Sequence, residues 1–241
     1  MKKIIILSLV LFCIAAGVVI VISQKPVVPQ LQPDKPSAPP IDLAALKAKA
    51  EAGDAAAQTS LGEIYEQGNG VTQDMKEAVK WFRKAADQNY PDALALLGEM
   101  TQAGQGVKAD PAAAAQLYTQ AAEKGSVAGQ YNLAYLYEQG IGVEKNEAKA
   151  SKWYQLAAEG GDPLAQFDIG QRYNLGMGVK ADKVQACKWL SLAAAQGQSD
   201  SMQMLHDLKS QMSADQIAEA DKLVKEFIPR ESKSATQGAN P

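Results

Sequence analysis

Residues 57–89 read AQTSLGEIYEQGNGVTQDMKEAVKWFRKAADQN, and this pattern returns three more times along the 241-residue chain. Three apolar residues spaced by four form one face of a first helix: Ala57, Leu61 and Tyr65. The Gly68-Asn69-Gly70 turn ends this helix, because glycine takes positive φ without strain. Asp74 is a natural N-cap for a second helix, and Glu77 is placed to complete a capping box. The stretch therefore predicts two helices joined by a tight turn.

The spacing of this unit is constant at 36 residues, without insertion or deletion. The first-helix pair Leu61-Gly62 recurs as Leu97-Gly98, Leu133-Ala134 and Ile169-Gly170. A fixed period of this length indicates stacked helical repeats, and no segment alternates with the period of two that a half-buried strand shows. We expect an all-α fold, a right-handed α-solenoid of helix–turn–helix repeats, with units at about 57–92, 93–128, 129–164 and 165–200.

The pattern continues past both ends of the four units. Residues 42–51 predict a lone second helix that opens the array, with Asp42 as its N-cap. Residues 200–212 predict a fifth first helix. Ser213 and Gln216 form a capping box that begins a terminal cap helix over 213–227. The predicted solenoid with its cap helices therefore occupies residues 41–228.

The repeated pattern is A-x-x-x-L-G-x-x-Y-x-x-G-x-G-V-x-x-D-x-x-x-A-x-x-W-[YF]-x-K-A-A-x-x-G. It resembles the Sel-one-like repeat (SLR), a relative of the tetratricopeptide repeat. Residues 57–89 match nearly every position, and the resemblance covers about 41–228. It implies a scaffold or adaptor that binds other proteins, often in bacterial envelopes. Family members associated with penicillin binding carry a cysteine pair in each repeat, and this chain has no such pairs.

Residues 4–23 contain no charged side chain and follow Lys2 and Lys3. As a helix they span about 30 Å, the thickness of the hydrocarbon core of a bilayer. We expect residues 1–23 to be an uncleaved transmembrane anchor, because the apolar run is longer than that of a removable signal sequence. The two lysines favour a cytoplasmic N-terminus. The chain is then a single-pass protein of the bacterial inner membrane with its domain in the periplasm or outside; cleavage near Ser23 to give a secreted or periplasmic protein is the alternative.

The segments on either side of the array differ from it in composition. Residues 24–40 hold six of the eleven prolines, which favours an extended polyproline II linker of up to about 50 Å. Residues 229–241 are polar and aperiodic, and we expect a disordered tail.

Charge and residue counts exclude several functions. The net charge is −3, and because residues 1–40 carry +3 and residues 229–241 carry +1, the 41–228 body carries −7. An acidic body is a poor partner for phosphate backbones, so we expect no nucleic-acid binding. The two cysteines, Cys13 and Cys187, are far apart, and His206 is the single histidine. We therefore expect no metal site, no cofactor and no catalytic residues.

The predicted function is that of a protein–protein interaction scaffold or adaptor in the bacterial cell envelope, not an enzyme. It would act as a monomer and bind a protein or peptide in the concave groove lined by the first helices. An envelope hydrolase of the β-lactam or cell-wall type is one alternative, although Ser-x-x-Lys and Gly-x-Ser-x-Gly motifs are absent. A structural spacer without a dedicated ligand is the other.

The candidate groove residues come from a helical wheel on which Leu61 and Tyr65 face inward. The positions equivalent to 59, 63 and 66 then face the groove. The partner-binding residues that we predict are Glu63, Glu66, Glu99, Tyr131, Tyr135, Phe167, Gln171 and Arg172. Tyr131 and Phe167 could equally pack between adjacent first helices, whereas the wheel favours the groove for Tyr135.

Arg172 departs from its column, in which the other repeats have an apolar residue: Ile64, Met100 and Leu136. Asp168 lies one helical turn earlier, at the i, i+4 spacing that suits an ion pair. We expect Arg172 to pair with Asp168; the alternative is that it awaits an acidic group of a partner.

Overall fold

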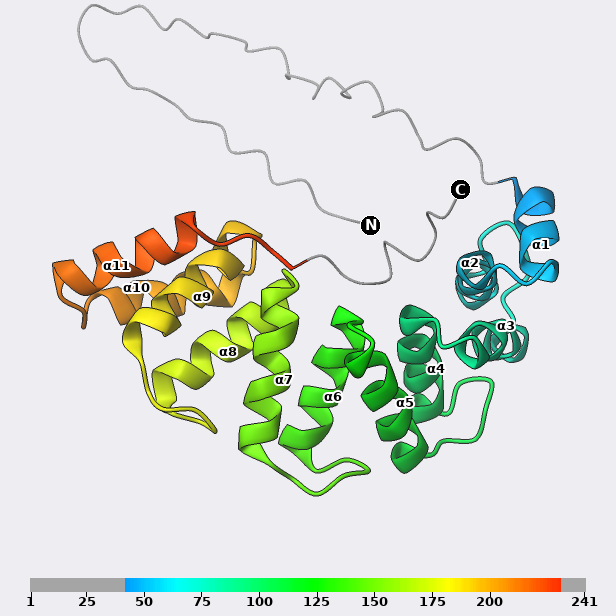
Figure 1. The fold of residues 1–241 in the computed structure, drawn as a ribbon, viewed down its shortest axis with the longest axis horizontal. Coiled ribbons are helices and arrows are strands. Elements are labelled where there is room, and N and C mark those ends of the chain that lie inside the picture. The colour runs from blue at the N-terminus through cyan, green and yellow to red at the C-terminus, as the bar shows by residue number, and fades with distance from the viewer. Residues whose placement is uncertain (1–41, 231–241) are drawn as a thin grey trace, which may run out of the picture. The chain divides into compact units, whose positions relative to one another are not determined.

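The computed structural model describes residues 42–230, and within that range it contains eleven helices and no strand. Figure 1 shows the helices following one another in chain order along a curved row. The even-numbered helices are the first helices of the repeats, and the odd-numbered helices are the second. Their bounds are α1 Leu43–Glu51, α2 Ala55–Gln67, α3 Met75–Asp87, α4 Pro91–Ala103, α5 Pro111–Glu123, α6 Val127–Gln139, α7 Glu147–Glu159, α8 Pro163–Leu175, α9 Lys183–Ala195, α10 Ser199–Lys209 and α11 Ala214–Lys225.

The helices begin where the predicted caps place them. The Asp42 carboxylate accepts a hydrogen bond from the Ala45 amide at the start of α1, and Ser213 and Gln216 form the complete capping box of α11. The expectation of a second capping box at Asp74 is wrong in one part. Asp74 caps α3, but the Glu77 carboxylate turns outward to the Lys80 ammonium at 3.0 Å.

Each first helix is tied to the start of its second helix by a backbone hydrogen bond. The amide of the N-cap residue Asp74 donates to the Tyr65 carbonyl at 2.9 Å, and the amide of Asp110 donates to the Thr101 carbonyl at 2.9 Å. The same bond closes the other two turns. This bond fixes the direction in which the second helix leaves the turn, so every repeat has the same hairpin geometry.

In each hairpin the second helix packs closely on the first helix because a small residue follows the recurring leucine or isoleucine of the first helix. A Cβ atom at Gly62 would lie 2.5 Å from Cε1 of Phe82, and one at Gly98 would lie 2.9 Å from Cε1 of Tyr118. The aromatic rings of the second helix therefore pack directly on first-helix backbone. The core is a series of such contacts, in which two alanine columns of the second helices, those of Ala78 and Ala85, are fully buried.

The second glycine of each turn joins one repeat to the next. A Cβ atom at Gly106, where φ is +69°, would lie 2.1 Å from the carbonyl oxygen of Met75 in the preceding repeat. Gly142 and Gly178 stand equally close to the carbonyls of Pro111 and Glu147. Neighbouring first helices also touch, since α4 contacts α6 and α8 contacts α10. The row is thus held together at its turns and along its first helices.

The predicted membrane anchor and proline-rich linker lie outside the described residues. Within residues 42–230, every helix is too short or too polar to span a bilayer.

Candidate functional site

The candidate surface is the outward side of the first helices α2, α4, α6 and α8, which we call the first-helix face. One column on it points outward in all four repeats: Glu63, Glu99, Tyr135 and Gln171. Glu99 and Tyr135 are exposed and the other two are half-buried; Tyr135 retains 41% of its accessible surface. Tyr135 is therefore an aromatic side chain that α6 holds out toward solvent.

Tyr131 on α6 and Phe167 on α8 each lie one helical turn before the outward column, and both side chains pack inward. The Tyr131 ring meets the Tyr154 ring edge to face, with 5.5 Å between centroids. Phe167 packs against the buried cluster that contains Cys187 and Leu208. Both rings are half-buried, so most of their surface serves the contact between neighbouring helices.

Carboxylates from neighbouring first helices face one another at the N-terminal end of this face. Burial, followed by the charge of Asp92 on α4, raises the pKa of Glu63 on α2. Burial, followed by the charges of Glu99 and Glu63, raises the pKa of Glu66. None of these four carboxylates forms an ion pair within residues 42–230. This part of the face therefore holds negative charge that no cation of the described chain neutralises.

Arg172 does not pair with Asp168, so that expectation is wrong. Its guanidinium is 2% exposed and donates to Glu138 on α6 and, at 3.0 Å, to Glu147 at the start of α7. It also donates to the Ser151 hydroxyl at 3.2 Å, and it lies 4.9 Å from the centre of the Tyr154 ring. Arg172 thus ties the third repeat to the fourth from inside and is not available to a partner.

Asp168 instead faces Tyr131. Burial and the charge of Glu138 raise the pKa of Asp168 to about 6, although a hydrogen bond from the Tyr131 hydroxyl and the charge of Arg172 oppose the shift. The Tyr154 hydroxyl donates to the second Glu138 oxygen at 2.9 Å. Together these groups form a connected polar cluster beneath the C-terminal half of the first-helix face.

The sequence signal for these contacts is a spacing of 34 residues. Glu138 and Arg172 are 34 positions apart, and so are Asp92 and Ser126, whose hydroxyl donates to Asp92 at 3.1 Å. In a 36-residue repeat this spacing joins neighbouring first helices. The i, i+4 rule for a single helix does not include it.

A second feature that sequence reasoning missed is a series of glutamines at the opposite ends of the helices. The side-chain amide of Gln130 donates to the Ala122 carbonyl at the end of the preceding second helix, and Gln58 and Gln166 make the equivalent bond. The oxygen of Gln58 accepts from Gln88, and that of Gln166 accepts from Gln196. These bonds satisfy carbonyls that a helix end otherwise leaves unpaired.

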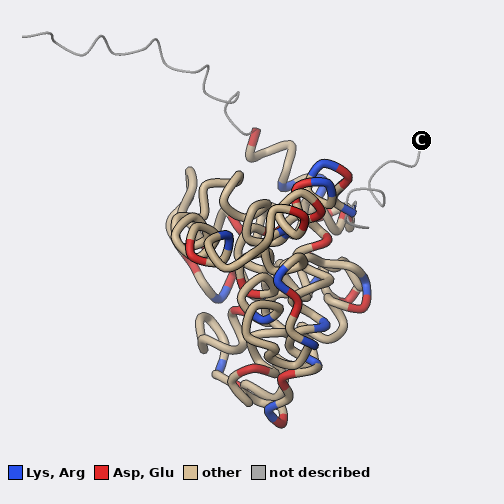
Figure 2. Tube along the Cα trace, turned by 90° about the vertical axis from the view of Figure 1, so that its left-hand side faces the viewer, with Lys and Arg blue, Asp and Glu red and all other residues tan. Residues whose placement is uncertain are grey.

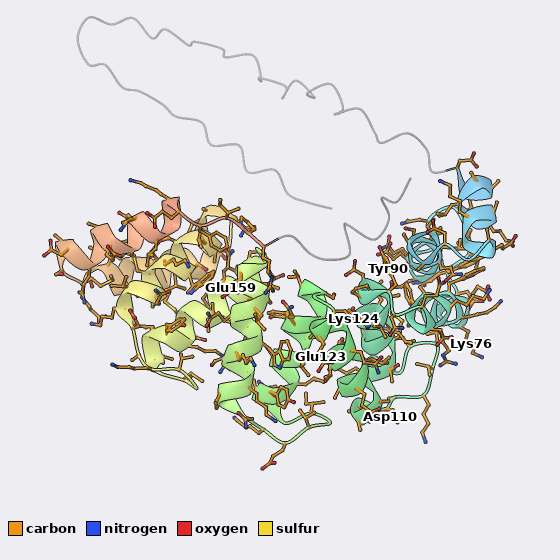
Figure 3. All side chains as sticks on the ribbon, viewed as in Figure 1. Lys76, Tyr90, Asp110, Glu123, Lys124 and Glu159 are labelled. Atoms are coloured by element: carbon orange, nitrogen blue, oxygen red, sulfur yellow. The ribbon has the colours of Figure 1, made fainter. Side chains whose placement is uncertain are left out.

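The oxygen of Gln130 receives no hydrogen bond from a second-helix glutamine, because Gly160 stands where Gln88 and Gln196 stand in the other repeats. Arg230 fills the gap: its guanidinium donates to the Gln130 oxygen at 3.2 Å and to the Leu156 carbonyl at 3.0 Å. Its amide donates to the carbonyl of Glu159 at 2.7 Å, at the end of α7 (Figure 3). Arg230, which the sequence placed in a disordered tail, is therefore fixed on the third repeat; the tail beyond it lies outside the described residues.

The remaining reactive side chains are isolated in the described part of the chain. Cys187 is buried and unpaired, and burial raises the pKa of its thiol. His206 is exposed on α10. Among residues 42–230, no three His, Cys, Asp or Glu side chains come close enough to hold a metal ion.

Comparison with known families and structures agrees with this architecture. The model of the Sel1 repeat matches residues 55–90, 91–126, 127–162 and 163–198, more than half of the chain. These units begin two residues before the ones that we expected from the sequence. The structure of a Sel1 repeat protein from Oxalobacter formigenes is 35% identical, covers 75% of this chain and 76% of its own, and superimposes with a TM-score of 0.64.

Two further similarities are less extensive. A protective antigen present in uropathogenic Escherichia coli strains, which displays an SLR fold, is 27% identical over 82% of this chain and 51% of its own, with a TM-score of 0.49. The secretory immunoglobulin A-binding protein EsiB of Escherichia coli O6:H1 is 51% identical over 45 residues. That match spans 19% of this chain and only 9% of EsiB.

Proposed function

Because the chain belongs to the Sel1 repeat family, whose members are generally protein-interaction scaffolds, we propose that it is a scaffold that binds a protein or peptide on its first-helix face. The observation that carries this proposal is the contrast between columns of the repeat. The column of Leu61, Leu97, Leu133 and Ile169 stays aliphatic and is buried in all four repeats. The outward column changes from Glu63 and Glu99 to Tyr135 and Gln171. Packing inside the array does not fix the residue type at these positions, so their side chains are available to contact a partner.

Tyr135 supports the same conclusion through its chemistry. Tyrosine is enriched among the residues that contribute most to protein interfaces, because it buries a large ring while keeping a polar hydroxyl group. Its ring is held on α6, between the acidic N-terminal half of the face and the polar cluster of the C-terminal half. A partner lying across the first helices would cover it.

The test is site-specific photo-crosslinking in cells that make the full chain. A photoreactive phenylalanine at position 135 or 171 should give a discrete adduct with one partner protein. The matched control is Gln116, exposed on the second helix α5, which should give none. Equal adducts from positions 116 and 135, or none from either 135 or 171, would contradict the proposal.

We further propose that the protein works in the bacterial cell envelope, held by residues 4–23. The uncharged run and the two preceding lysines support this placement. A C-terminal alkaline phosphatase fusion should be active, and carbonate should fail to extract the protein. An inactive fusion would contradict the orientation, and a mature chain that begins at Gln24 would replace the anchor by a cleaved signal sequence.

A further inference from the structure

Residues 227–230, beyond the end of α11, form a C-terminal strap that lies on α9 and α7. Its Phe227 ring meets the Trp189 ring edge to face, with 5.5 Å between centroids. The Lys188 ammonium lies over both rings, 4.0 Å from the centre of Trp189 and 5.4 Å from the centre of Phe227. With the strap in place, Trp189 keeps only 2% of its accessible surface.

The strap continues across the end of α7. Pro229 lies next to Gly161, where a Cβ atom would come within 3.4 Å of the Pro229 Cβ. The Arg230 amide then donates to the Glu159 carbonyl at 2.7 Å. The strap therefore binds this site with an aromatic ring, a proline two positions later and a backbone amide.

The residues of this site recur one repeat earlier. The four that meet the strap here are Trp189, Lys188, Glu159 and Gly161. The residues 36 positions earlier have the same types: Trp153, Lys152, Glu123 and Gly125. Glu159 and Glu123, both labelled in Figure 3, are the last residues of α7 and α5. The third repeat thus carries a second copy of the site that the strap occupies on the fourth.

The copy in the third repeat is open. Trp153, Glu123 and Leu156 help to line a cavity of about 260 Å³, and Trp153 is only half-buried. The Lys152 side chain is exposed. The Glu123 carbonyl corresponds to the acceptor of the Arg230 amide, and among residues 42–230 it receives no backbone hydrogen bond. The ring, the cation and the carbonyl are thus all accessible to a ligand.

The first and second repeats differ from the third at this place. In the first repeat the Lys84 ammonium lies 3.9 Å from the centre of the Trp81 ring, which is 4% exposed. In the second repeat Leu117 replaces the tryptophan. Leu156 stands in the third repeat where Lys84 stands in the first, and it leaves the Trp153 ring half-buried.

The strap ends at the edge of the open site. The Arg230 side chain lines the same cavity, where its guanidinium donates to the Gln130 oxygen at 3.2 Å and to the Leu156 carbonyl at 3.0 Å. The occupied site and the open site are therefore neighbours on one surface. A ligand on Trp153 would continue the interface that the strap has already formed.

Charge does not decide which ligand fits, because the site offers exposed groups of both signs, Lys152 and Glu123. Figure 2 shows the same mixture along the trace, where short blue and red segments are separated by uncharged stretches. The distinguishing group is the ring of Trp153, on which an aromatic side chain can pack edge to face. Lys152 can lie over such a ring, as Lys188 lies over Phe227.

We propose that the Trp153 site binds an extended segment of a partner protein in which an aromatic residue is followed two positions later by proline, the spacing of Phe227 and Pro229. The aromatic ring of this segment packs on Trp153 beneath the Lys152 ammonium, and a backbone amide donates to the Glu123 carbonyl. The site contains no residue of the outward column. The inference therefore goes beyond the function proposed above, and its test does not involve position 135.

The experiment measures binding of labelled peptides to the full chain by fluorescence anisotropy. The probe has the sequence of residues 226–231, Glu-Phe-Ile-Pro-Arg-Glu, and in the matched peptide alanine replaces phenylalanine. The probe should bind, and the alanine peptide should bind at least about tenfold more weakly because it lacks the ring that anchors the segment. Equal binding of the two peptides, or no binding of the probe, would overturn the proposal.

Two variants that copy other repeats locate the probe on the chain. Trp153→Leu introduces the residue of the second repeat, and Leu156→Lys introduces the lysine that covers Trp81 in the first. Each should weaken binding of the probe about tenfold, and circular dichroism checks that each is folded. Gln120→Lys adds the same charge at the equivalent, exposed position of the second repeat and should change binding less than twofold. Unchanged affinity in either of the first two variants would overturn the proposal.

A third variant, Phe227→Ala, distinguishes the open site from the one that the strap occupies. The parent chain should bind one probe peptide, whereas Phe227→Ala should bind two, because the Trp189 site is then open as well. A single peptide bound about tenfold more tightly by Phe227→Ala than by the parent would place the probe on Trp189 and overturn the proposal.

Two further measurements test other occupants of the Trp153 site. Size-exclusion chromatography of the parent should show a monomer with and without the probe; a dimer that the probe dissociates would identify the strap of a second copy as the occupant. Deletion of residues 231–241 should leave the affinity for the probe unchanged. Binding that is detected only after this deletion would identify those residues as the occupant. Either of these contrary results would overturn the proposal.

Discussion

At the scale of single residues, Arg172 shows how a buried charge can replace an apolar side chain in a repeat. Its guanidinium is 2% exposed, but both of its carboxylate partners reach water, with 27% of Glu138 and 34% of Glu147 accessible. The charge that pays the larger desolvation cost is therefore the arginine. Removing the arginine and removing the two carboxylates should therefore change the stability of the fold by unequal amounts.

We predict that Glu138→Gln combined with Glu147→Gln destabilises the fold by about 3 kcal/mol, because the buried guanidinium loses both carboxylates to which it is bonded. Arg172→Leu restores the apolar type of the column and should cost only about 1 kcal/mol, since the freed carboxylates can hydrate. Urea unfolding followed by circular dichroism measures both. An Arg172→Leu variant that is less stable than the double variant would contradict this account.

Asp168 provides a pH-dependent test of the same cluster. Its folded pKa of about 6 lies above its ordinary value of 3.8, so the folded chain binds this proton more tightly than the unfolded chain does. The contribution of Asp168 to stability is present below about pH 4 and is lost as the pH rises through 6. Asp168→Asn should remove this loss and stabilise the chain by about 2 kcal/mol at neutral pH. Melting curves of the two chains that run parallel from pH 4 to pH 7 would contradict the prediction.

Residue-scale contacts were also the least predictable part of the molecule. Helical-wheel geometry correctly leaves Tyr135 exposed, because exposure depends on the local period of one helix. The partner of Arg172 depends on how two repeats stack. Asp168 was the nearest acid along the chain, yet Glu138, 34 positions away, is nearer in space.

At the scale of elements, the second glycine of a turn has two roles: it takes positive φ, and it allows close contact with the preceding repeat. Gly70 and Gly106 occupy the same place in successive repeats, with φ of +77° and +69°. A Cβ atom at Gly70 would meet nothing within 4 Å, whereas one at Gly106 would overlap the carbonyl of Met75. Substitution of these two glycines therefore distinguishes the cost of backbone strain, present at both, from the cost of lost packing between repeats, present only at Gly106.

We predict that Gly70→Ala costs about 1 kcal/mol, the cost of placing an alanine in the left-handed region. Gly106→Ala should cost at least about 2 kcal/mol more, because backbone cannot move aside as a flexible side chain can. Thermal melting of the two variants decides the matter. Equal losses would show that the second glycine serves only its own turn.

The C-terminal segment makes a second element-scale prediction. Arg230→Ala removes the donor that Gln130 and the Leu156 carbonyl share, which is worth about 1 kcal/mol locally. The backbone amide at position 230, bonded to the Glu159 carbonyl, should then exchange with deuterium about fivefold faster. Lys225→Ala, at the exposed end of α11, is the control and should leave that rate unchanged. An unaffected rate in Arg230→Ala would mean that Pro229 and its neighbours hold the segment without the guanidinium.

Most elements could be predicted from the sequence because their ends are fixed locally. Asp42, Asp74 and Ser213 each cap a helix that begins at the next residue. The place of Arg230 could not be predicted, because it depends on a side chain that Gly160 lacks, 70 positions earlier. Local side-chain contacts determine where a helix begins. The position of Arg230 depends instead on how the repeats stack.

At the scale of the whole molecule, the repeat separates stability from recognition. The aliphatic column and the Ala78 and Ala85 columns are buried, and the second turn glycines Gly106, Gly142 and Gly178 lie against the backbone of the preceding repeat, so the units stack as one regular array. The outward column Glu63, Glu99, Tyr135 and Gln171 differs from repeat to repeat on that support. The resulting molecule offers partners a first-helix layer that is acidic and a second-helix layer that is basic.

The central claim is that the partner covers the first-helix layer, and hydrogen–deuterium exchange of the full chain with and without its crosslink-identified partner tests it most directly. Peptides from α2, α4 and α6 should exchange more slowly in the complex, and those from the exposed sides of α3, α5 and α7 should be unchanged. Protection confined to α3, α5 and α7 would contradict the claim and place the binding surface on the opposite layer.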